Sequence, residues 1–168
     1  MAEPSATSAD QSKHYLDEQT AGRFRDYKPA VKLESEGWQA MSLPDNVQLD
    51  TDVPSRIGLT NKRYATVGIN IYPPGARDDM HCHPGSEHIF IVMEGELRVY
   101  GVREGEDVIL KPGEFVHINQ SYFYQLANET EKTTVICGVF TKPPKKPKLT
   151  RYTYRGQNGV DPATLEGE

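Results

Sequence analysis

The feature that most constrains this chain is a regular alternation of short β-rich runs and turn residues. Glycine, proline or asparagine interrupts the chain about every 8–12 residues, which is typical of an antiparallel sandwich or barrel. There is no 3.6-residue period after Val31 and no internal repeat, so one all-β barrel is predicted rather than a helical bundle or two fused copies. The predicted strands are Trp38–Met41, Arg56–Leu59, Tyr64–Tyr72, His88–Met93, Leu97–Tyr100, Val108–Leu110, Phe115–Ile118, Tyr122–Leu126 and Thr133–Phe140.

Both ends of the chain differ in composition from this β-rich centre. Residues 1–13 are small and polar, so we expect a disordered tail there, followed by a short helix over Tyr15–Phe24. The predicted domains are an N-terminal extension with accessory strands at 14–60, a barrel core at 61–141, and an arm and tail at 142–168. Lysines and prolines open that arm, and proline donates no hydrogen bond to a sheet, so we expect extended structure there and a late strand within 149–154.

Length, charge and cysteine content exclude several classes of protein. The 168 residues suffice for one hydrophobic core, and no apolar run reaches the roughly 18–20 residues that span a bilayer. The net charge of −5 argues against a nucleic-acid partner, so the lysines of the arm are interpreted as a solvated linker. Two cysteines form no disulfide framework, and the first residues do not resemble a secretory signal, so we expect a cytoplasmic protein without a membrane partner.

The placement of histidine is the strongest indication of chemistry. Three of the five histidines, His81, His83 and His88, fall within eight residues. Alternation along a strand puts His81 and His83 on one face, and the turn at 84–86 allows His88 to return beside them. A lone histidine would fit an ordinary polar position at a sheet edge, but three at this spacing predict a site for Fe, Mn, Zn, Ni or Cu.

The same residues resemble the first motif of the cupin superfamily. That motif has a glycine, five residues, His-x-His, four residues, a glutamate, six residues and a glycine. Here the spacing runs from Gly75 through His81 and His83 to His88 and ends at Gly95, with histidine in the place of glutamate. The resemblance implies a double-stranded β-helix (jelly-roll) barrel with extended termini, whose metal is held by histidines alone. Strand alternation favours His88 over its neighbour Glu87 as the third ligand.

A second cupin motif is present in degenerate form. It begins at Gly113 and ends at Asn128, but Asn119 and Ser121 replace its proline and glycine, and Tyr124 replaces its metal-binding histidine. A phenol ligates well only if the metal lowers its pKa from near 10, so we expect Tyr124 to serve as a catalytic hydrogen-bond donor or acid. His117 is an alternative fourth ligand if the strand register brings it inward.

Side chains that share the face of the histidines are expected to line a substrate pocket. These are Phe90, Val92, Tyr72 and Leu126. On the strand before Gly75, either Asn70 and Tyr72 or Ile69 and Ile71 face inward. The charged residues at 77–79 are expected to form an exposed turn, with Asp79 and Glu87 as reserve bases.

The resemblance to cupins implies a metal-dependent enzyme that acts on a small organic anion. The leading prediction is a non-haem iron dioxygenase of an aromatic or dicarbonyl-type substrate. One alternative is a redox-neutral cyclase, isomerase or lyase similar to polyketide cyclases, and another is a non-catalytic cupin that binds a small molecule. The apolar outer face expected of a cupin sheet, with extra strands from residues 31–60, predicts a homodimer.

Overall fold

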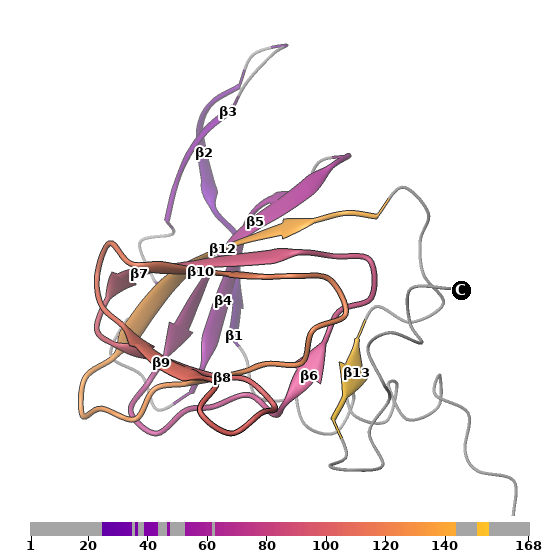
Figure 1. The fold of residues 1–168 in the computed structure, drawn as a ribbon. Helices are drawn as coiled ribbons and strands as arrows, with labels where there is room; N and C mark the ends of the chain where they lie inside the picture. Colours follow the sequence, from indigo (N-terminus) through magenta and orange to yellow (C-terminus); the bar gives the residue numbers. More distant parts are fainter. Residues whose placement is uncertain are drawn as a thin grey trace, which may run out of the picture.

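A computed structural model of the chain describes residues 25–34, 36, 39–43, 47, 53–61, 63–143 and 151–154. Every regular element in these ranges is a strand, so they contain no helix long and apolar enough to cross a membrane. The all-β prediction is therefore confirmed for this part of the chain (Figure 1). The tail predicted at 1–13, the helix predicted over Tyr15–Phe24 and the arm from residue 144 to 150 lie outside the described residues.

A six-stranded sheet forms the larger wall of the barrel. Its strand order is β1-β4-β5-β12-β7-β10, and only β1 and β4 run parallel. The eight-residue strands β5 and β12 pair along their whole length, so the middle of this sheet is continuous. The bounds are β1 Arg25–Tyr27, β4 Ser55–Asn61, β5 Ala65–Tyr72, β12 Thr134–Thr141, β7 His88–Glu94 and β10 Phe115–Ile118.

Smaller sheets complete the structure. Three strands in the order β11-β8-β9 form the opposite wall (Figure 1), with bounds Gln125–Ala127, Leu97–Tyr100 and Asp107–Leu110. Strand β6, His81–Cys82, pairs with β13, Tyr152–Thr153, which is where the predicted late strand forms. Strands β2 and β3, Ala30–Glu34 and Gln39–Ser42, pair as a hairpin that projects away from the barrel (Figure 1).

Alternation along β5 divides the interior into two apolar clusters. Ile69 and Ile71 pack with Ile57 of β4 on one face of the large sheet. Tyr72 points to the other face, into the main core between the two walls, where Phe90 and Leu126 also lie. The choice left open by the sequence is thereby settled: the even-numbered residues of β5 face the barrel interior.

The strand predicted over Tyr122–Leu126 begins only at Gln125. Ser121 has a φ of 62°, which places it in the left-handed region, and Tyr122 N–H bonds back to the carbonyl of Asn119 at 3.2 Å. The chain therefore turns before it can pair with β8. Tyr124 instead forms an isolated bridge with His81, which draws the second motif against the first.

Two glycines in turns offer a test of this packing. Gly95, between β7 and β8, has a φ of 75°, and a Cβ there would lie 2.5 Å from the carbonyl oxygen of Thr133; Gly105 has a φ of 79° with nothing within 4 Å. We expect Gly105→Ala to lower the free energy of unfolding by about 1–2 kcal/mol, from backbone strain alone. Gly95→Ala should lose roughly 1–3 kcal/mol more, because the methyl group also collides with the chain. Denaturant titration measures both, and equal losses would contradict the close approach at Gly95.

Candidate metal centre

A cavity of about 390 Å³ opens between the large sheet and the segment that carries the first motif. Its volume lies in the range of small-molecule sites. Strands β4, β5, β7 and β12 contribute its sheet side, and the segment 78–83 and the second motif close it. It is lined by Arg56, Thr66, Gly68, Asn70, Tyr72, Asp78, His81, His83, His88, Phe90, Tyr124, Leu126, Phe140 and Arg151.

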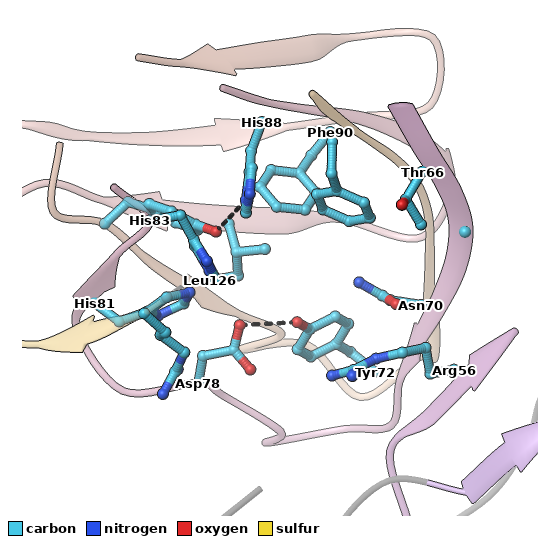
Figure 2. A pocket seen from close by; sticks show the side chains of 14 residues that line it. Arg56, Thr66, Asn70, Tyr72, Asp78, His81, His83, His88, Phe90 and Leu126 are labelled. Carbon is cyan, nitrogen blue, oxygen red and sulfur yellow. Dashed lines mark hydrogen bonds between the residues drawn. The ribbon is translucent and has the colours of Figure 1, made fainter. Parts of the chain in front are cut away.

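All three histidines of the first motif line this cavity and lie together at one side of it (Figure 2). The ring centroids of His81 and His83 are 5.0 Å apart, and those of His83 and His88 are 4.2 Å apart. His81 and His88 are buried, at 4% and 6% exposed. The turn at 84–87 thus brings His88 back beside the other two, as strand alternation predicts.

Hydrogen bonds and burial fix the protonation of two of these rings. The Nδ1 of His81 lies 2.8 Å from the carbonyl oxygen of Asp79, and because a carbonyl only accepts, that nitrogen carries the proton. The Nδ1 of His88 lies 2.8 Å from the hydroxyl of Tyr124. Burial lowers the pKa of His88 to about 2 and that of His81 well below its usual value. Both are therefore neutral imidazoles, and the Nε2 of His81 is unprotonated and available to bind a metal ion.

The donor set suits a transition metal, but the rings as they lie pack on one another. The planes of His83 and His88 are inclined by only 37°. Within the described ranges, no group of three or more His, Cys, Asp or Glu side chains is arranged to hold a metal ion. Neutral imidazoles are nevertheless ligands for Fe, Mn, Zn, Ni and Cu, so the chemistry of these residues fits such an ion once the rings reorient.

Tyr124, at the position where the second motif usually has histidine, is joined to the first motif twice. Its backbone exchanges two 2.9 Å hydrogen bonds with His81, and its hydroxyl bonds to His88. Burial, followed by the charge of Asp78, holds the pKa of Tyr124 well above its usual value. Tyr124 is therefore a neutral phenol that positions His88.

Asp78 lines the cavity, which the sequence did not reveal because the charged segment 77–79 was expected to be an exposed turn. Its carboxylate accepts a 3.0 Å hydrogen bond from the hydroxyl of Tyr72, and both side chains line the cavity (Figure 2). The segment turns inward because Asp78 N–H donates to the carbonyl of Leu126, and Gln125 Nε2 donates to the carbonyl of Asp78. Burial raises the pKa of Asp78 above its ordinary value.

Two arginines also line the cavity. Arg56 follows Ser55 and precedes Ile57, which are both fully buried on the opposite face, so alternation along β4 turns Arg56 toward the cavity. Arg151 donates to Asp79 at 2.7 Å and is 8% exposed. The alternation of residues 55–57 could have indicated that Arg56 faces the cavity. The position of Arg151 could not be predicted in this way, because it depends on the pairing of β13 with β6.

Other predicted residues divide between the cavity and its surroundings. Tyr72, Phe90 and Leu126 line the cavity, but Val92 does not. Val92 lies two residues further along β7, paired with Ile136, and packs in the barrel core at 1% exposed. Val92, predicted as a pocket residue, therefore lies in the barrel core and not among the residues that line this cavity.

His117 lies on the outer face of the large sheet and does not reach the histidines. Its Nε2 bonds at 3.1 Å to the carboxylate of Glu87, and both residues are exposed. His117, the alternative fourth ligand, and Glu87, a reserve base, therefore lie outside the cavity that the three histidines line. Cys82, between two histidines, is fully buried, and burial raises the pKa of its thiol to about 12.

Comparisons with known proteins agree with this architecture. A model of the Cupin domain family matches residues 68–140. No curated protein matches the chain significantly.

Similar solved structures include three bacterial proteins. TT1209 from Thermus thermophilus has 19% identity and a TM-score of 0.52 over 58% of this chain and 91% of its own. A double-stranded β-helix protein from Klebsiella pneumoniae has 18% identity and a TM-score of 0.52, over 60% and 86%. The polyketide cyclase RemF from Streptomyces resistomycificus has 15% identity and a TM-score of 0.52, over 63% and 74%. Residues 68–140 therefore match the Cupin domain family, and the similar structures show that the barrel shares the fold of double-stranded β-helix proteins.

Proposed function

We propose that the protein is a metal-dependent enzyme that moves protons on a small organic anion, as an isomerase, cyclase or lyase. The observation that carries this proposal is the carboxyl of Asp78, which is bonded to Tyr72 and faces the same cavity as three imidazoles (Figure 2). A carboxyl whose pKa is raised by burial exchanges protons more readily near neutral pH than a solvated one. A raised carboxyl pKa is useful to an enzyme that transfers protons, whereas a dioxygenase reaction does not require it.

The histidines supply the proposed metal ligands. His81, His83 and His88 would hold a divalent transition metal through imidazole nitrogens; for His81 this is Nε2, because its Nδ1 donates to the carbonyl of Asp79. Such an ion, when bound, polarises a carbonyl or enolate oxygen as a Lewis acid. Three neutral imidazoles cancel none of its charge, which favours an anionic substrate.

The remaining side chains have separable roles in this proposal. Asp78 removes a proton from a carbon next to a carbonyl and returns it elsewhere on the same molecule, while Tyr72 orients the carboxylate through its hydroxyl. Tyr124 holds the ring of His88 in place. Arg56 and Arg151 add positive charge around the substrate, and apolar Phe90 and Leu126 exclude water from it.

An iron dioxygenase is the second candidate, and the all-histidine donor set favours it. Neutral imidazoles are compatible with Fe(II), and three of them leave coordination positions for a substrate and dioxygen. The two candidates differ in their need for oxygen. Turnover under strictly anaerobic conditions is expected for the proton-transfer enzyme and impossible for the dioxygenase.

Replacing the carboxyl of Asp78 tests the proposed function. Metal-reconstituted protein is incubated anaerobically in D₂O with a panel of small β-dicarbonyl compounds and 2-oxo acids, and NMR follows exchange of the carbon-bound hydrogen. We expect exchange by the wild type and a loss of about 10²–10⁴-fold in Asp78→Asn, because an amide cannot accept the proton. Glu87→Gln, which removes an exposed carboxylate outside the cavity, is the matched control. Full activity of Asp78→Asn, or substrate loss only in air, would contradict the proposal.

The metal ligands are tested by elemental analysis of purified protein. We expect His88→Ala to lose bound transition metal, since one of three proposed donors is removed. His117→Ala removes a histidine from the neighbouring strand β10 and should retain the metal, because that side chain lies on the outer face. Equal metal content in both variants, with circular dichroism unchanged, would exclude His88 as a ligand.

A further inference from the structure

Three glycines lie side by side across the large sheet. Gly58 of β4 pairs with Gly68 of β5, and Gly68 pairs in turn with Gly138 of β12. All three share the face of Asn70 and Tyr72, since they stand at even-numbered steps of paired strands. At these three positions, this face of the sheet therefore carries no side chain of its own.

The three positions differ in what covers them. At Gly138 the ring of Phe140 occupies the space that a Cβ would need. Gly68 lines the cavity, and a Cβ there would lie 3.1 Å from the carbonyl oxygen of Ile57. Gly58 does not line the cavity; it is exposed, with nothing within 4 Å of its Cβ position. Neither Gly58 nor Gly68 has a positive φ, so the backbone conformation does not call for glycine at either place. A glycine inside a strand often marks a surface that a ligand approaches closely.

Arg56 stands at the end of this bare surface. It is two residues before Gly58 on the same strand and pairs with Asn70, and it lines the cavity next to Tyr72 (Figure 2). The histidines lie at the other side of the cavity, with Asp78 and Tyr72 between them and Arg56 (Figure 2). A guanidinium is the side chain best suited to bind a carboxylate through two parallel hydrogen bonds.

We propose that the substrate is a flat, elongated organic carboxylate that spans this cavity. Its carboxylate is bound by Arg56, its body lies over Gly68 in the cavity and over Gly58 at the edge of the cavity, and its opposite end reaches the histidines. Phe90 and Phe140, whose ring centroids are 5.7 Å apart, offer aromatic edges and faces to the planar body. The chemistry at the histidine end rests on the proposed function, but the mode of binding does not.

Binding of three probes to the protein as purified tests this proposal. The probes are 2-naphthoate, its neutral amide 2-naphthamide, and acetate, each titrated by calorimetry. We expect wild type to bind 2-naphthoate at least about tenfold more tightly than 2-naphthamide, and Arg56→Gln to lose that preference. Arg63→Gln, which removes an exposed arginine in the β4–β5 turn that does not line the cavity, should behave as wild type.

The glycine surface is tested by filling it. Gly58→Val should fold normally, since the site is open and valine is a better strand residue than glycine. We expect this variant to weaken both naphthalene probes about tenfold and to leave acetate unchanged. Equal affinity of wild type for the acid and the amide, unchanged binding by Gly58→Val, or no binding of any probe would overturn the proposal. The proposed function is judged by hydrogen exchange in Asp78→Asn and this proposal by the binding of the naphthalene probes, so failure of the proposed function and failure of this proposal give different results.

Discussion

The continuous pairing of β5 with β12 is the constraint on which the cavity depends. Because these two strands stay in register over eight residues, every even-numbered side chain of β5 and its partner on β12 reach the same face. One face is filled with aliphatic residues such as Ile69 and Ile71, and the other carries Asn70 and Tyr72. A shift of one residue would place isoleucines in the cavity and bury the polar groups without partners.

Burial then determines the protonation state of the side chains that line the cavity. The same loss of solvent lowers the pKa of His81 and His88 and raises the pKa of Asp78. Each shift favours the uncharged form, because charge is costly away from water. The cavity therefore combines neutral nitrogen donors with a carboxyl that exchanges protons more easily. Its positive charge comes from arginines, which stay protonated.

The fold and the histidine cluster could be predicted from the sequence because both depend on local patterns. Turn residues at regular spacing define the strands, and two-residue alternation places His81 beside His83. Asp78 could not be found this way, since its inward position depends on hydrogen bonds to Gln125 and Leu126, nearly fifty residues later. Val92 shows the same limit, because strand parity gives the face of a side chain but not how far along the strand a cavity extends.

Arg151 shows how distant segments complete the histidine side of the cavity. Strand β13 pairs with β6, and this places the guanidinium of Arg151 against the carboxylate of Asp79. The carbonyl of that same Asp79 accepts the Nδ1 proton of His81. An ion pair that fixes Asp79 thus also fixes the donor that orients His81, although Arg151 lies seventy residues away in sequence. The orientation of a proposed ligand in the first motif therefore depends on a strand near the end of the chain.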